Sequence, residues 1–420
     1  MGDRHGNTTV EKCELFAQHF RQIFRSSTAT TAEIDLALNS IPSDVIDFSS
    51  FLITNQQVEA AIDKMCSSFA PGPDGIPCCV LKKCKAEFIH PLRLLFNLSL
   101  RRCVFPTSWK LSVMFPVHKK GDKRDVQNYR GITSLCACSK VFEIIIYDTL
   151  FASCKQYIST DQHGFYPKRS TATNLVQFTA TCPQNMSEGA QIDAVYTDLK
   201  AAFDRVDHKI LLAKMEKLGA ASAIVQWLRS YLVDRTLCAM IGSQQSACFS
   251  NLSGVPQGSN LGPLLFSLYI NDASLVLPEN CRMFFADDVK LFKIIRNITD
   301  CEELQRLVDI FHNLLTVSIQ KCCVISFNRK NDPILYSYSI SGQTLTRVNQ
   351  IRDLGVTLDA ALSFKPHYNE IILKANRQLG FIFKIASEFR DPLCLRSLFY
   401  SLVRSVLETN CVVWCPYNAN

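Results

Sequence analysis

The chain has 420 residues, of which 47% are hydrophobic and 20% charged, and its formal net charge is +7. This composition excludes a disordered or collagen-like polypeptide, and the length allows several subdomains around a large core. No apolar run approaches the ~18 residues of a membrane-spanning helix, and the first residues lack the pattern of a secretory signal. The mild basic excess is compatible with a phosphate-backbone partner.

The 19 cysteines are scattered and often adjacent, and they do not show the spacing of a zinc site. We therefore expect them to act as small apolar residues in a reduced, intracellular chain. Nuclear and cytoplasmic locations are both compatible with the sequence.

In chain order, hydrophobic periodicity predicts a succession of mainly helical and mixed segments. They are an amphipathic helix at 11–24, a Ser/Thr-rich linker at 25–55, a mainly helical stretch at 56–105 broken by a Pro-Gly loop at 71–77, a strand at 114–117, a helix at 139–156, strand, helix and hairpin units at 190–298, a helix at 300–317, and helices near 366–388 and 392–408. Periodicity alone therefore predicts a mixed α and β protein.

The segment Phe285-Ala286-Asp287-Asp288 lies between two short apolar runs of strand-forming residues. Two such strands joined at a pair of acids predict a β-hairpin with carboxylates at its turn. Adjacent aspartates repel each other, and this arrangement is useful where divalent cations bind between them. An Asp-Asp pair by itself is more often a solvated turn than a metal site, so the metal-site interpretation depends on the other motifs in the sequence.

Two other segments favour a phosphate-handling site. A strand-like run at 192–197 ends in Asp198 and is followed by a helical stretch from about 208 to 218. Asp198 is a candidate metal ligand, and the alternative is a helix cap. The loop at 253–259 is rich in Gly and Pro, so its backbone can approach a base or phosphate closely or simply turn. Ser259 is a candidate cap for an apolar helix at 261–270.

Together with further blocks in a fixed order, these segments resemble the reverse transcriptases of LINE-type (non-LTR) retrotransposons, closest to the jockey-like group. The blocks lie at 70–77, 119–122, 128–132, 162–165 with 169–170, 198–204, 254–259, 287–288 and 353–356. The resemblance runs from about Glu11 to Trp414.

The resemblance implies an α/β (α+β) right-hand polymerase fold. It divides the chain into an N-terminal extension (1–55, the amphipathic helix and linker), fingers (56–185), a palm with the catalytic aspartates (186–345), and a primer grip with a truncated thumb (346–420). It also implies an RNA-directed DNA polymerase that uses an RNA template, a DNA primer and deoxynucleoside triphosphates, without a membrane partner.

The implied catalytic and metal-binding residues are Asp198, Asp287 and Asp288. Mg²⁺ is the implied ion, with Mn²⁺ as the alternative, because two such ions activate the primer 3′-hydroxyl and stabilise the leaving pyrophosphate.

The resemblance assigns other roles residue by residue. They are nucleotide binding for Lys119, Lys120, Arg130, Phe203, Gln257 and Gly258, general acid for Lys321, and primer grip for Leu354 and Gly355. Phe203 is placed to exclude a ribose 2′-hydroxyl, and the alternative is a core phenylalanine. Asp204 and Asp193 fall outside the matching positions, and we expect Asp204 to make a structural hydrogen bond or salt bridge.

Some positions depart from the family pattern. Phe311 and Ser318 stand where the family usually has Trp and Asn, and the interval before Lys321 is about two residues short. The chain resembles the polymerase region of a longer element. Because the resemblance implies a truncated thumb, we expect an apolar face to be exposed at 412–414. Two alternatives remain open: a degraded remnant that at most binds nucleic acid, and a host enzyme of the telomerase or intron-maturase type.

Overall fold

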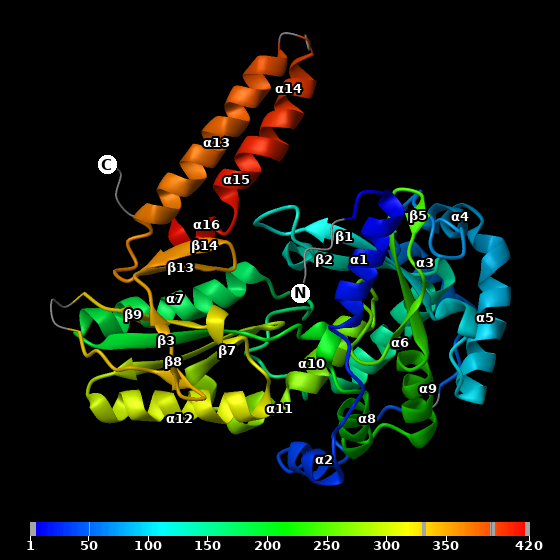
Figure 1. Cartoon of the computed structure of the whole chain (residues 1–420), viewed down its shortest axis with the longest axis horizontal. Coiled ribbons are helices and arrows are strands. Elements are labelled where there is room, and N and C mark those ends of the chain that lie inside the picture. The colour runs from blue at the N-terminus through cyan, green and yellow to red at the C-terminus, as the bar shows by residue number, and fades with distance from the viewer. Residues whose placement is uncertain (1–5, 50, 330–332, 387, 389–390, 416–420) are drawn as a thin grey trace. The chain divides into compact units, whose positions relative to one another are not determined.

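The computed structural model describes residues 6–49, 51–329, 333–386, 388 and 391–415. They form two compact units, each built from two stretches of chain (Figure 1). Unit 1 contains residues up to 159 and residues 200–276, and unit 2 contains residues 160–199 and those from 277 onward. The mixture of helices and sheets predicted from the sequence is confirmed.

Unit 1 combines ten helices, among the residues described, with one sheet. The helices are α1 (Thr9–Arg21), α2 (Thr31–Leu38), α3 (Asn55–Lys64), α4 (Cys78–Lys83), α5 (Lys85–Arg102), α6 (Ala137–Cys154), α8 (His208–Lys217), α9 (Ser222–Leu232), α10 (Gly262–Ile270) and α11 (Asp272–Val276). The strands are β1 (Leu111–His118), β2 (Tyr129–Ser134), β4 (Arg235–Ile241), β5 (Gln244–Gln245) and β6 (Phe249–Asn251). β1 pairs antiparallel with β2 and parallel with β4, which in turn pairs with β5 and β6.

The amphipathic helix predicted near the N-terminus is α1. Its apolar face, with Phe16 and Phe20, packs on the sheet around Met114 and Phe249. A second apolar centre holds Phe142, which stacks on Phe96 with ring centroids 4.4 Å apart. These contacts bury aromatic surface in unit 1 and contribute to its hydrophobic stabilisation.

The Ser/Thr-rich stretch predicted as a linker contains a helix. α2 begins after a capping box in which the Thr30 hydroxyl accepts from the Glu33 amide and the Glu33 carboxylate accepts from the Thr30 amide. Such reciprocal bonds satisfy two amides that a helix start otherwise leaves unpaired. The following segment is also ordered by packing, since the Ile46 amide donates to the Leu218 carbonyl at 2.8 Å.

Unit 2 is built on a five-stranded sheet in the order β12-β9-β3-β8-β7. The strands of the unit are β3 (Gln191–Asp198), β7 (Arg282–Phe285), β8 (Asp288–Ile295), β9 (Cys323–Phe327), β10 (Ser339–Ile340), β11 (Gln343–Thr344), β12 (Thr346–Arg347), β13 (Gln350–Asp353) and β14 (Val356–Asp359). Its helices are α7 (Thr171–Ser187), α12 (Ile298–Leu314), α13 (Lys365–Ala386), α14 (Pro392–Phe399), α15 (Ser405–Glu408) and α16 (Cys411–Trp414).

The two faces of this sheet are covered by different helices, as Figure 1 shows for α7 and α12. Ile192 and Ala194 of β3 belong to the core that α7 shares with the β13–β14 hairpin. Because side chains alternate along a strand, Asp193 and Val195 project to the opposite face. Both faces of β3 are therefore buried.

The predicted C-terminal helices are present, but one expectation about the chain end was wrong. Val412 is 67% exposed, as expected, whereas Trp414 is only 8% exposed and belongs to the unit 2 core. Its ring packs edge-on against His367 and Tyr368 of α13. Among the residues described, no helix has the length and apolar character needed to cross a bilayer.

Candidate active site

The predicted acidic hairpin is present in unit 2. Phe285 at the end of β7 pairs with Asp288 at the start of β8, so Ala286 and Asp287 form a two-residue turn. Ala286 has φ 56°, in the left-handed region that a residue with a Cβ adopts only at a cost. Such strain persists where neighbouring groups impose the conformation.

Those neighbouring groups come from the 161–164 segment. The Gln162 side-chain oxygen accepts from the Ala286 amide at 3.0 Å and from the Gly164 amide at 2.8 Å. Gly164 lies so close to the turn that a Cβ there would collide with the Ala286 amide nitrogen. Asp161 forms a buried ion pair with Arg282 of β7, 2.9 Å between Oδ2 and Nε. The segment therefore fixes the turn in its strained form.

Asp198 and Asp288 are direct cross-strand partners at the open end of β3 and β8. Paired residues in antiparallel strands project to the same face, so both carboxylates leave the sheet on one side. Burial, followed by the charges of Asp287, Asp198 and Asp353, raises the pKa of Asp288 to about 6. The charges of the neighbouring aspartates thus disfavour ionisation of Asp288.

Lys321 approaches the same group. Its Nζ donates to Asp198 Oδ2 at 2.9 Å, and both side chains are solvent-accessible. The Ser318 amide donates to the Asp198 carbonyl at 2.7 Å, and Val317 bridges to Leu199. The short interval noted in the sequence thus still places Lys321 beside Asp198, while Phe311 is buried at the position where the family has Trp.

The donor chemistry at this end of the sheet suits a divalent cation. Carboxylate oxygens are the ligands that Mg²⁺ and Mn²⁺ prefer, and a cation would relieve the carboxylate repulsion that, after burial, raises the pKa of Asp288. Within the described part of the chain, however, no three His, Cys, Asp or Glu side chains already lie together at metal-binding geometry. The Asp198 carboxylate faces Lys321 instead.

Leu354 and Gly355 form the turn of the β13–β14 hairpin, both with positive φ. This is the pattern of a type I′ turn, and it suits glycine at the second position. Just before the turn, buried Asp353 accepts from Lys290 Nζ at 2.5 Å and from the Tyr196 hydroxyl at 3.0 Å. Since these partners lie on β8 and β3, the hairpin is tied to the strands that carry the aspartates. Sequence reasoning missed this link.

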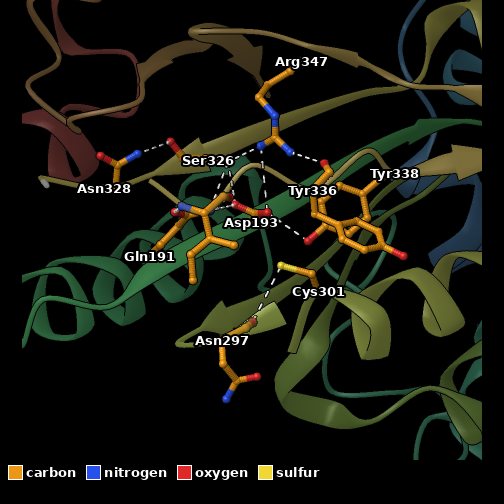
Figure 2. Close-up of polar contacts among 10 residues, drawn as sticks. Gln191, Asp193, Asn297, Cys301, Ser326, Asn328, Tyr336, Tyr338 and Arg347 are labelled. Atoms are coloured by element: carbon orange, nitrogen blue, oxygen red, sulfur yellow. Dashed lines mark hydrogen bonds and ion pairs between the residues drawn. The ribbon is translucent and has the colours of Figure 1, made fainter. Parts of the chain in front are cut away.

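Asp193, which the sequence placed outside the site, is fully buried on the opposite face of the sheet. Figure 2 shows its carboxylate surrounded by Gln191, Ser326, Tyr338 and Arg347. Ser326 Oγ and Gln191 Nε2 donate to one oxygen at 2.5 and 2.7 Å, and the Tyr338 hydroxyl donates to the other at 2.9 Å. Arg347 lies 3.9 Å away. A carboxylate so fully partnered is a structural anchor.

Unit 1 holds the candidate nucleotide-binding residues. Lys119 and Lys120 follow β1, and Arg130 lies exposed on β2 opposite Val117. Gly258 packs against β2, because a Cβ there would lie 2.6 Å from the Thr133 carbonyl oxygen. The β1–β2 hairpin and the 254–259 loop are therefore neighbours, as a shared pocket requires.

Asp204, the residue after Phe203, is hydrogen-bonded to Gln257. Gln257 Nε2 donates to Asp204 Oδ1 at 2.6 Å, which agrees with the structural hydrogen bond expected for Asp204. The Phe203 ring is half-buried and stacks on Phe266 of α10, with centroids 4.3 Å apart. Lys119 acts on the pKa of Asp204, so it belongs to the same neighbourhood.

Comparison with known proteins identifies the class. The model of the reverse transcriptase (RNA-dependent DNA polymerase) family matches residues 117–358, more than half of the chain. The chain therefore belongs to the reverse transcriptase family and has its mixed α/β polymerase fold.

Three curated relatives are similar to the chain over most of its length. The chain is 29% identical to a probable RNA-directed DNA polymerase from transposon BS of Drosophila melanogaster, over 85% of this chain and 41% of that protein. It is 26% identical to the RNA-directed DNA polymerase from mobile element jockey of the same organism, over 87% of the chain and 42% of that protein. A probable polymerase from transposon X-element is also 26% identical, over 97% and 46%. The chain thus spans less than half the length of these relatives.

Proposed function

We propose that the chain is an RNA-directed DNA polymerase of a non-LTR retrotransposon, which adds deoxynucleotides to a primer 3′-hydroxyl under the direction of an RNA template. The observation that carries the proposal is the register pairing of Asp198 with Asp288 beside the Asp287 turn. The family match and the similarity to polymerases of the BS and jockey elements support it.

In this proposal Asp198, Asp287 and Asp288 hold Mg²⁺, with Mn²⁺ as the alternative ion. Bound there, the ions would supply activation of the attacking oxygen and charge neutralisation at the leaving phosphates. Lys321, 2.9 Å from Asp198, is proposed to deliver a proton to the leaving pyrophosphate after its ion pair with Asp198 is exchanged.

The other proposed roles follow the domain division into fingers (56–185), palm (186–345), and primer grip with thumb (346–420). The cations Lys119, Lys120 and Arg130 would bind the triphosphate, since cationic side chains neutralise charge during phosphoryl transfer. Phe203 would select the sugar, with Gln257 and Gly258 beside the templating pair. Leu354 and Gly355 would contact the primer end from a hairpin that Asp353 ties to the catalytic strands.

The decisive test is primer extension on poly(rA)/oligo(dT) with Mg²⁺. We expect the wild-type protein to extend the primer and Asp287→Asn to lose extension while keeping template–primer binding. Glu302→Gln, which removes an exposed carboxylate of α12 in the same unit, is the matched control and should remain active. A wild-type protein no more active than Asp287→Asn would refute the polymerase assignment, and loss of both binding and extension in Asp287→Asn would indicate a folding role.

A further inference from the structure

Two segments of unit 1 that lie about 50 residues apart are joined along their backbones. They are the turn at 203–208, just beyond Asp198, and the loop at 253–259. The bonds run from Gly254 N to Val206 O (2.8 Å), from Val255 N to Phe203 O (2.9 Å), from Ser253 Oγ to Asp204 O (2.6 Å) and from His208 Nε2 to Gly254 O (2.7 Å). The turn and the loop therefore form one continuous piece of structure.

The close packing of the loop backbone against the turn requires glycine at position 254. Gly254 has φ 83°, and a Cβ at this position would lie 2.6 Å from both the Asp204 Cα and the Phe203 carbonyl oxygen. Backbone atoms cannot yield as the end of a flexible side chain can. The two segments are thus packed main chain to main chain, and neither can shift without the other.

A hydrogen bond between two side chains also joins the turn and the loop, and it involves the candidate nucleotide-binding residue Gln257. Asp204 Oδ1 accepts from Gln257 Nε2 at 2.6 Å, a short distance that fits a charge-assisted hydrogen bond. Gln257 is the side chain that the loop presents next to Gly258, and Asp204 directly follows Phe203. The bond therefore fixes the orientation of the Gln257 amide relative to the turn that carries Phe203.

Keeping the Asp204 carboxylate ionised in this buried position is energetically unfavourable. Burial raises the pKa of Asp204 to about 6, and the Gln257 bond and the charges of Lys119 and Arg205 offset this only in part. Arg235 of β4 lines a small cavity together with Asp204 and Gln257. His208, whose own pKa is lowered by burial, is hydrogen-bonded to the Gly254 carbonyl of the adjoining loop. A group with a raised pKa stabilises the fold below its unfolded pKa and loses that contribution as the pH rises through 6. At neutral pH the ionised side chain thus works against stability.

We propose that Asp204 is a positioning residue that holds Gln257 in register with Phe203, so that the 253–259 loop and the sugar-selecting turn discriminate nucleotides as one unit. The inference rests on the proposed polymerase function. A residue needed only for folding would not be expected to carry a destabilising charge, whereas a residue that orients a neighbour by a charge-assisted bond needs that charge.

The test is a charge-exchange series: Asp204→Asn, Gln257→Glu and the double variant. Gln257→Glu places two carboxylates at hydrogen-bond distance, and the double variant restores an amide–carboxylate pair with its polarity reversed. The measurement is the ratio of kcat/KM for deoxynucleotide to that for ribonucleotide on poly(rA)/oligo(dT). We expect Gln257→Glu to lower this ratio about tenfold, the lower end of what a charge-assisted hydrogen bond supports, and the double variant to regain most of it. Asp35→Asn, an exposed carboxylate of α2, is the matched control.

Two further readouts separate positioning from folding. Discrimination by the wild-type protein should fall as the pH drops through about 6, and Asp204→Asn should abolish this dependence. The thermal midpoint of Asp204→Asn at pH 7.5 should equal or exceed that of the wild type. A lower midpoint, an unchanged pH profile, or a double variant no better than Gln257→Glu would each overturn the inference.

Failure of the polymerase assignment is distinguishable from failure of the inference. If the wild-type protein matches Asp287→Asn in extension, the assignment fails, and amide hydrogen exchange of the 253–259 loop then decides the inference. Faster exchange in Gln257→Glu, reversed in the double variant, would support the Asp204–Gln257 bond as the holding contact, and equal exchange in all variants would overturn it.

Discussion

The carboxylate cluster at the end of β3 and β8 leads to a counter-intuitive prediction: replacing Asp288 by Asn should stabilise the protein when no divalent cation is present. The pKa of Asp288 is raised from 3.8 to about 6 by burial and by the neighbouring aspartates. A group with a raised pKa contributes stability below its unfolded pKa, and that contribution is lost as the pH rises through about 6. At pH 7.5 the ionised side chain therefore destabilises unit 2.

The expected gain in the free energy of unfolding follows from the pKa shift of Asp288. Two pKa units correspond to about 3 kcal/mol in the absence of screening. Neighbouring protein atoms desolvate the Asp288 carboxylate enough to raise its pKa, yet a large part of the residue is still open to solvent, so screening reduces this to about 1 kcal/mol. For a unit of roughly 180 residues, such a gain raises the thermal midpoint by roughly 2–4 °C.

The assay is thermal unfolding of wild type and Asp288→Asn in EDTA at pH 7.5 and pH 4.5, with Glu302→Gln as the exposed-acid control. The variant should be more stable at pH 7.5, and the difference should shrink at pH 4.5. Added Mg²⁺ should raise the wild-type midpoint more than that of the variant, since a ligand stabilises the state it binds. A variant less stable than wild type in EDTA at pH 7.5 would refute the proposed repulsion among these carboxylates.

Three other predictions concern separate parts of the chain. Phe203→Val should raise ribonucleotide incorporation relative to deoxynucleotide in single-nucleotide extension, and unchanged discrimination would assign the ring to core packing. Arg130→Ala should raise the KM for deoxynucleotide more than it weakens template binding, with exposed Arg124→Ala as control, and the reverse pattern would make Arg130 a template-backbone contact. Trp414→Ala should destabilise unit 2 by about 3–5 kcal/mol in denaturant unfolding, whereas Val412→Ala should change it by less than about 0.5 kcal/mol, and equal effects would contradict the burial of Trp414.

The elements that sequence predicted well are those whose own residues determine them. The hairpin at Asp287 follows from two strand-forming runs that meet at acids, and β3 from a strand-like run that ends at Asp198. The capping-box residues of α2, Thr30 and Glu33, are visible in the sequence, but the Ser/Thr-rich composition around them is equally typical of a linker.

Other features depend on partners distant in sequence. α7 carries several Thr residues, which favour helix only weakly, and an internal proline, Pro183, which disfavours it, so the helix depends on tertiary packing against β3 and β7. The ion pair between Lys290 and Asp353 joins residues 63 positions apart, so no local sequence pattern predicts it. Likewise, an acid inside an apolar strand, such as Asp193, gives no indication of which groups will neutralise it.

The anchor at Asp193 also sets an order of assembly during synthesis. Asp193 leaves the ribosome before the whole 200–276 stretch of unit 1, while its partners Ser326, Tyr338 and Arg347 come later still. At ordinary translation rates the delay is on the order of ten seconds. During that time β3 has no complete pocket for its carboxylate, so we expect the unit 2 sheet to close only after residue 347. Nascent chains stopped before residue 339 should leave β3 unprotected in hydrogen exchange, and early protection would contradict this order.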